Sequence, residues 1–447
     1  MVENRVVLEK KQRSKNQMGN HSSSSWHQEI QKYPHNEKLV ELYISLCDYG
    51  ILNKDLFQKH FSLPNTPLAS NLFERYFIDL LNSCAQTRLM FVERSHAILQ
   101  NADNNSIENL QFYFDLIIDE KRDLDHHDLK LIVLNCIQVG ITQADSMANT
   151  NMDSLINDYL VDGIASGCLN GASTVSRNDV ISWLNSNCKN IFSGFQTWLQ
   201  HKFTGLSQKG KFEMLSLPQE CLTINSLLTS AVLWYLCSVL PSCFTSLHNK
   251  FNADDIDAES NLDYTWHILF DSNQHGLSLN RFKHKIMDYK SPTITFIQFS
   301  TGLTIVLGLD QRWTDSPEKF GGPYCYLIEL FPCVNIVETN SNMVYLKEMG
   351  RSIPTGLIIG SGNRPKVKIS IDLSTAEIIY KGLLNETVER VEVWGCGGEA
   401  AIKHQADMKK WEQKEIEKRK KVKLPGQWDT DKVILEMAGV QVNHSQR

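Results

Sequence analysis

The sequence lacks the cysteine spacing of a zinc or dithiol site. Its eleven cysteines are odd in number and scattered, and no two of them form a C-x-x-C pair. We therefore expect reduced thiols and no metal centre. An excess of basic residues is also missing, because 45 Lys and Arg stand against 51 Asp and Glu and leave a net charge of −6. This balance argues against nucleic acid as a partner.

No long hydrophobic run is present either. The longest one, Leu227 to Leu240, contains Thr229, Ser230 and Ser238 and is shorter than the roughly 20 residues that cross a bilayer. It predicts a buried helix. The first residues are charged throughout and have no apolar segment typical of a secretion signal, so we expect a cytoplasmic protein.

Motifs for catalysis and cofactor binding are absent or incomplete. No G-x-S-x-G elbow occurs, and the run from Gly205 to Phe212 fits a phosphate-binding loop except that Phe212 replaces the Ser or Thr that binds magnesium. The acidic segment Asp119 to Lys130 departs from a calcium-binding EF-hand loop at three of its key positions. We therefore expect no catalytic, cofactor-binding or metal-binding residue.

Two glycine-rich stretches leave alternatives open. The loop Gly360 to Asn363 predicts a tight turn, with anion binding by its backbone as the alternative. Cys396 lies between glycines in the stretch Gly395 to Gly398, where a reactive thiol is the alternative to a packed side chain. No base or second cysteine is identifiable for Cys396, which favours packing.

The composition predicts a folded chain with several parts. Its 447 residues are 42% hydrophobic, enough for two or three structural units. Residues 1–25 are polar and serine-rich, which predicts a disordered tail. Apolar residues recur at helical spacing from 26 to 205, as in Leu39, Leu42, Tyr43 and Leu46, and predict an all-helical region.

The second half of the chain predicts an antiparallel sheet within residues 217–398, because short β-rich segments alternate there with Gly, Pro, Asn and Asp. The expected strands cover Thr265–Phe270, Thr293–Phe299, Leu303–Leu309, Tyr324–Phe331, Val334–Glu338, Lys366–Leu373 and Val388–Trp394. A helix from Leu279 to Tyr289 interrupts them. Residues 399–447 predict a charged helix followed by a short amphipathic helix.

The β-rich half resembles the TLDc domain family. The resemblance rests on Trp266–Ser272, His275–Ser278, Phe320–Gly322, Tyr324–Pro332, Ile353–Leu357, Ile371–Leu373 and Val391–Gly395. Their order and spacing agree from about Leu217 to Gly398. One departure is Gly360-Ser-Gly362, where many relatives carry G-G-x-G. The whole arrangement resembles the lysosomal MTOR-associated subgroup of TLDc proteins, the MEAK type.

The resemblance implies an α+β fold, in which an EF-hand-like helical region precedes a two-sheet β-sandwich flanked by helices and a C-terminal helix follows. It implies binding to subunits of the vacuolar proton pump (V-ATPase), a link to MTOR signalling components, and a peripheral position on the lysosomal membrane surface. It implies no enzymatic activity and no cofactor. The alternative function is protection against oxidative stress through cysteine redox chemistry, and an adaptor for membrane traffic is a third possibility.

Particular residues are expected to carry these roles. Met18-Gly-Asn-His-Ser-Ser fits an acylation signal, so Gly19 is a lipidation site only if translation starts at Met18. In the last helix, an apolar stripe is expected to bind a partner, and docking onto the chain's own domains is the alternative; the stripe includes Trp428, Val433, Ile434 and Met437. Four aromatic residues of the strands are expected in the core: Trp266, Phe270, Tyr326 and Trp394.

Overall fold

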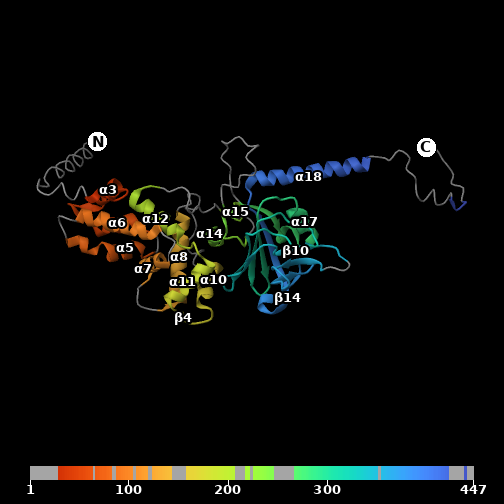
Figure 1. Cartoon of the computed structure of the whole chain (residues 1–447), viewed down its shortest axis with the longest axis horizontal. Helices are drawn as coiled ribbons and strands as arrows, with labels where there is room; N and C mark the ends of the chain where they lie inside the picture. The colour runs from red at the N-terminus through yellow and green to blue at the C-terminus, as the bar shows by residue number, and fades with distance from the viewer. Residues whose placement is uncertain are drawn as a thin grey trace.

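The structure is a computed structural model of the whole chain (Figure 1). It describes residues 29–63, 66–82, 87–103, 107–118, 123–142, 158–206, 217–221, 225–245, 266–350, 354–421 and 437–439. The tail expected at 1–25 lies outside these residues. None of the helices in the described part is long and apolar enough to cross a membrane.

The first half of the chain is helical, as its periodicity predicts. Its helices are α3 (Asn36–Leu46), α4 (Lys54–Phe61), α5 (Leu68–Tyr76), α6 (Thr87–Asp103), α7 (Ile107–Ile117), α8 (His126–Thr142), α10 (Tyr159–Leu169), α11 (Arg177–Asn187) and α12 (Ser193–Thr204), with a 3-10 turn at Ile78–Asn82. Polar side chains cap several of these helices, as when Asn53 accepts the backbone N–H groups of Asp55 and Leu56. Stacked aromatic rings such as Phe57 and Phe61 fill the interior.

Two pairs of very short strands connect these helices. The pair β1 (Cys47–Asp48) and β2 (Ile51–Leu52) lies between α3 and α4, and β3 (Leu124–Asp125) pairs with β4 (Thr174–Val175). The second pair joins the connection before α8 to the connection between α10 and α11. The helices that follow these two strands, α8 and α11, each start with a side-chain cap. Asp125 accepts the N–H of Asp128, and Ser176 accepts the N–H of Asp179.

The second half contains one large antiparallel sheet. Its strands are β5 (His267–Asp271), β6 (Thr293–Phe299), β7 (Thr304–Leu309), β8 (Cys325–Phe331), β9 (Asn335–Asn340), β10 (Val344–Lys347), β11 (Gly356–Ile359), β12 (Val367–Ile369), β13 (Thr375–Ile378) and β14 (Leu383–Gly395). They follow the order β10-β11-β12-β13-β14-β6-β7-β8-β9, and β5 pairs with β14. All seven expected strand positions are occupied by strands.

The two sheets of the expected β-sandwich are joined, because the described strands form one continuous hydrogen-bonded sheet with two halves. The 13-residue strand β14 belongs to both halves: its first part pairs with β13, and its second part pairs with β5 and β6. The two halves fold over a shared apolar core, in which Ile305 and Leu307 of β7 cluster with Leu357 and Ile359 of β11. One long strand therefore connects the two layers that face each other over this core.

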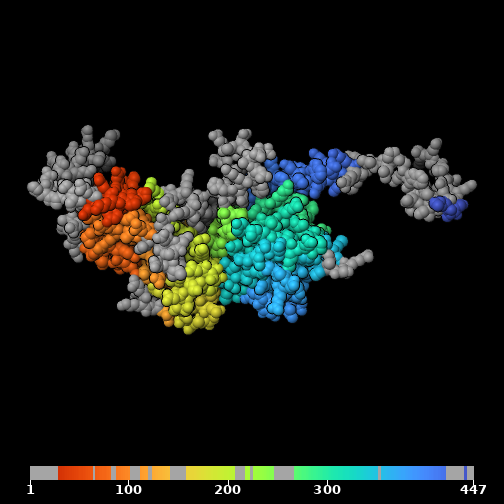
Figure 2. Space-filling model, in the orientation of Figure 1, coloured from red at the N-terminus to blue at the C-terminus, as the bar shows by residue number. Residues whose placement is uncertain are grey.

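The other face of the β6–β8 region is covered by helices. Residues that alternate with the shared core, such as Phe296, Val306 and Ile328, cluster with α14 (Ser230–Val239) and with the helical first half. Both faces of these strands are thus buried, which explains why their sequences read as nearly continuous apolar runs. Figure 2 shows the helical half and the sheet half in broad contact.

The expected core aromatics are mostly buried. Trp266, Phe270 and Trp394 are at most 1% exposed, whereas Tyr326 is only partly buried. The helix expected at Leu279–Tyr289 is α17 (Leu279–Ile286), and the charged helix is α18 (Gly398–Lys421). Figure 1 shows α18 running along the sheet half, with its C-terminal end extending beyond it. The domain boundaries themselves stay predictions.

Candidate functional site

Most residues singled out for partner contact or lipidation lie outside the described residues. This holds for Gly19, Trp428, Val433 and Ile434. Met437 is described, and it is 85% exposed. The partner-binding role of this stripe stays a prediction.

Cys396 is positioned as a packed side chain. It is 9% exposed, and its backbone N–H donates to the Pro292 carbonyl at 2.9 Å. Burial raises the pKa of the Cys396 thiol well above its usual value of 9.0. Because the thiolate is the reactive form of cysteine, this environment disfavours the redox alternative.

The loop Gly360 to Asn363 is a turn, as favoured by its sequence. Gly360 and Gly362 have φ values of 124° and 60°, which favour glycine. The Ser361 N–H donates to the Glu338 carboxylate at 3.0 Å. A carboxylate of the same chain therefore already occupies the position that an anion would take.

Within the described residues, no group of three or more His, Cys, Asp or Glu side chains could hold a metal ion. Asp125 serves as the cap of α8, as its position before that helix suggests. Gly205 ends α12 with a φ of 66°. The run that resembles a phosphate loop thus begins at a helix end, and its last residues lie outside the described part.

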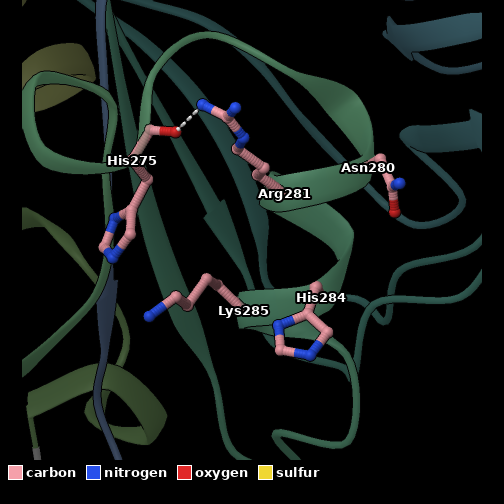
Figure 3. A pocket seen from close by; sticks show the side chains of 5 residues that line it. All are labelled: His275, Asn280, Arg281, His284 and Lys285. Atoms are coloured by element: carbon pink, nitrogen blue, oxygen red, sulfur yellow. Dashed lines mark hydrogen bonds between the residues drawn. The ribbon is translucent and has the colours of Figure 1, made fainter.

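A pocket on the sheet half gathers basic side chains. It has a volume of about 240 Å³ and is lined by His275, Asn280, Arg281, His284 and Lys285 (Figure 3). The chain reaches it from β5 through α16 (Ser272–His275) and then turns into α17. Figure 3 shows the Lys285 side chain and the His275 ring extending into the same space between α16 and α17.

The sequence of α17 explains this arrangement. Leu279, Phe282 and Ile286 are spaced for one face of a helix and are buried. The intervening Arg281 and His284 are therefore exposed. The apolar spacing predicts the helix, and the basic residues between the apolar positions are the sequence feature that accompanies the pocket.

The turn before α17 fixes the arginine. Gly276 has a φ of 73°, and a Cβ atom there would lie 2.7 Å from Arg281 Nη1. The same Nη1 donates to the His275 carbonyl at 2.6 Å. Glycine at this position therefore provides both the backbone turn and the space for the guanidinium group.

The helix α18 is anchored beside this pocket. Gln405 Nε2 donates to the carbonyls of Lys285 and Met287 at 2.8 and 2.9 Å, and Gln405 is 7% exposed. Lys409 Nζ lies 3.4 Å from the same Lys285 carbonyl. Burial lowers the pKa of the Lys409 ammonium, Lys285 lowers it further, and Asp288 and Glu412 oppose the change. The first part of α18 is thus fixed to the end of α17.

The pocket, α17 and the sheet lie within a segment that matches a known domain. Residues 225–397 match the family model described as TLDc domain. This protein therefore contains a TLDc domain. The resemblance derived from the strand residues is confirmed for this part of the chain.

Curated relatives of this chain are fungal proteins called "Restriction of telomere capping protein 5". The protein from Colletotrichum graminicola is 52% identical over 54 residues, which cover 12% of this chain and 9% of the relative. The one from Komagataella phaffii is 24% identical over 248 residues, or 39% of this chain and 42% of the relative. The matches thus span less than half the length of these relatives. Neither the family model nor these relatives single out the MEAK type.

Proposed function

We propose that this protein is a non-catalytic adaptor that binds the V-ATPase through its TLDc domain and the helix that follows it. The observation that supports the proposal best is the continuity of the TLDc domain with α18. Only the first part of this helix packs on the domain, and farther along Trp411 is 58% exposed and Ile416 is 52% exposed. Because these two apolar side chains lie beyond the part of α18 that packs on the domain, they are available to a partner.

The charge of this helix fits the same role. Residues 399–423 carry nine basic and five acidic residues, which gives a net charge of +4 (9 − 5) on a chain whose total is −6. A local positive charge of this kind accelerates the encounter with an acidic partner surface. Salt screens this attraction and so reduces the effect. We propose that α18 presents the segment with Trp428, Val433, Ile434 and Met437 to a pump subunit.

We also propose that the protein is cytoplasmic, that it is held peripherally at the lysosomal membrane, and that it is linked to MTOR signalling components. These parts derive from the resemblance. If translation starts at Met18, acylation of Gly19 adds a membrane contact. A single myristoyl chain binds membranes with K of about 10⁴ M⁻¹, so attachment needs a second contact such as the pump.

We also propose that the helical half is EF-hand-like in architecture and does not bind calcium. Its β3–β4 pair links two helix–strand–helix units, as paired EF-hand loops are linked. Calcium titration of the full chain tests this proposal, and a heat signal with one or two sites would contradict it.

The names of the relatives suggest a second candidate, a role in restricting telomere capping. The similarity to those proteins is the observation that favours it. Capture of partners by the full chain from separate membrane and nuclear extracts distinguishes the candidates. V-ATPase subunits recovered from membranes support the adaptor, whereas recovery of telomere-associated proteins alone supports the second candidate.

A further inference from the structure

The pocket beside α17 concentrates positive charge. Four of its five lining residues are basic, namely His275, Arg281, His284 and Lys285, and the fifth is Asn280. None of the five is acidic. Every lining side chain therefore has at least one hydrogen-bond donor, and two of them are cations at neutral pH.

Arg281 and Lys285 differ in their ion pairing from Lys283, which lies on the same helix. Lys283 lies between Arg281 and Lys285 in sequence, yet its ammonium forms ion pairs with Asp315, at 2.5 Å, and with Glu348. Across the described residues, Arg281 and Lys285 have no carboxylate partner within ion-pair distance. Carboxylates thus neutralise Lys283 on one face of the helix. Among the described residues, Arg281 and Lys285 on the pocket face have no such counterion.

The arginine is also held in place before any ligand binds. Its Nη1 donates to the His275 carbonyl, and Gly276 leaves room for it. The other nitrogen atoms of the guanidinium group keep their donors available. Because a preorganised side chain loses little entropy on binding, this arrangement favours recognition of an anion.

The size and donors of the pocket indicate the kind of anion. Its volume of about 240 Å³ lies below the roughly 300–1,000 Å³ of pockets that enclose drug-sized ligands. It suits one anionic group and part of its carrier. Arginine binds phosphate in a bidentate fashion, and lysine adds a compact charge. A phosphate monoester, with three terminal oxygens, accepts from more of these donors than a carboxylate does.

We propose that this pocket binds a phosphate monoester group, carried either by a soluble inositol phosphate or by a phosphoinositide lipid headgroup. Arg281 and Lys285 neutralise the phosphate, and Asn280 and the histidines complete its hydrogen bonds. The proposal does not depend on the V-ATPase, because the pocket lies on α17 and uses none of the residues assigned to pump contact.

The test measures binding of inositol trisphosphate to the full chain by calorimetry, and binding to phosphatidylcholine vesicles with or without phosphatidylinositol bisphosphate by flotation. Lys285→Gln is the main variant, because the Lys285 side chain makes no hydrogen bond or ion pair with any residue that the structure describes, so its loss is expected to leave the fold intact. Arg281→Lys is the second variant, because it keeps the charge and removes the bidentate geometry. Lys189→Gln, an exposed change on the helical half, is the control.

We expect the unaltered chain and Lys189→Gln to bind equally, and each pocket variant to bind about tenfold more weakly, as for the loss of one charge-assisted hydrogen bond. Binding to inositol trisphosphate alone assigns a soluble ligand, and binding to vesicles as well assigns the lipid. Absence of binding to both probes, or equal binding by Lys285→Gln, overturns the proposal. Equal binding to vesicles in which phosphatidylserine supplies the charge also overturns it. Pump association is expected to be the same in all these variants.

Discussion

Arg390 and Glu392 form a buried ion pair on β14, with 2.7 Å between Arg390 Nη2 and Glu392 Oε1. Each side chain also holds the segment that precedes α14. Arg390 donates to the Asn225 carbonyl at 2.7 Å, and Glu392 accepts from the Ser226 hydroxyl at 2.7 Å and from the Leu227 N–H at 2.9 Å. The pair therefore fixes the start of the TLDc domain to its central strand.

Removal of the carboxylate is expected to destabilise the protein strongly. Glu392→Ala removes the carboxylate at 2.7 Å from the buried Arg390 guanidinium and leaves Asp271, at 3.8 Å, as its carboxylate partner. Breaking a buried pair costs about 3–5 kcal/mol. Equilibrium unfolding in urea measures this loss. Glu389→Ala, an exposed change on the same strand, is the control and is expected to shift the free energy of unfolding by less than about 0.5 kcal/mol. Equal effects of the two changes would show that the pair contributes nothing specific.

Trp394 is expected to be structural. Its side chain is fully buried, and its indole N–H donates to Glu392 at 3.1 Å. Trp394→Ala should lower the free energy of unfolding by about 3–5 kcal/mol, the range for large core aromatics. Trp394→Phe retains much of the apolar contact and should cost less. A Trp394→Ala protein with normal thermal unfolding and lost partner binding would instead make Trp394 an interface residue.

Gly163 sets the distance between the helical half and the sheet half. A Cβ atom at this position of α10 would lie 2.4 Å from the Leu330 carbonyl oxygen of β8, and the Val334 N–H donates to the Gly163 carbonyl at 2.8 Å. Gly163→Ala should therefore separate the halves and cost about 1–3 kcal/mol. Faster hydrogen exchange at the Val334 amide is the expected sign. Ser166→Ala on the same helix is the control, and unchanged exchange in Gly163→Ala contradicts the packing described here.

His60 and Lys202 should make stability depend on pH. His60 Nε2 lies 2.8 Å from the Lys202 carbonyl, and Lys202 Nζ donates to the His60 carbonyl at 2.8 Å. Burial lowers the pKa of the His60 imidazole below its usual 6.5. As the pH falls below 6.5, the imidazole of His60 takes up a proton in the unfolded chain before it does so in the folded chain. The stability that is present above pH 6.5 is therefore lost.

Melting temperatures between about pH 7.5 and about pH 5.5 measure this dependence. The unaltered protein should lose stability as the pH falls, and His60→Gln should lose less across the same interval. A slope that is the same for both proteins would show that His60 does not contribute to it.

The strands that the sequence predicted are those with long apolar runs. It missed β10, β11 and β13, which have four residues each. β12 has only three residues but lies in the longer alternating run Lys366–Leu373, which shows the period. It also extended one strand to Leu373, whereas β12 ends at Ile369. Asp372 accepts hydrogen bonds from Ser370 and Ser374 there, and this local turn competes with the strand.

The continuity of the two halves of the sheet through β14 could not be predicted, because it depends on which strands pair with each part of this long strand. The helix α17 was predictable from its apolar spacing. Its pocket was not, since it depends on the left-handed backbone of Gly276 and on the contact between Arg281 and the His275 carbonyl. Both are properties of the folded backbone.

Association with the V-ATPase is tested most directly by deleting Gln427–Arg447 and measuring capture of pump subunits from lysosomal membranes by immunoblot. The truncated chain should keep the melting temperature of the TLDc domain and capture less pump, with a larger deficit at higher salt if the basic helix contributes. The full chain at the same salt is the reference. A truncated chain that melts at a lower temperature and captures the pump as well as the full chain would contradict this account, because the last helix would then be an intramolecular contact.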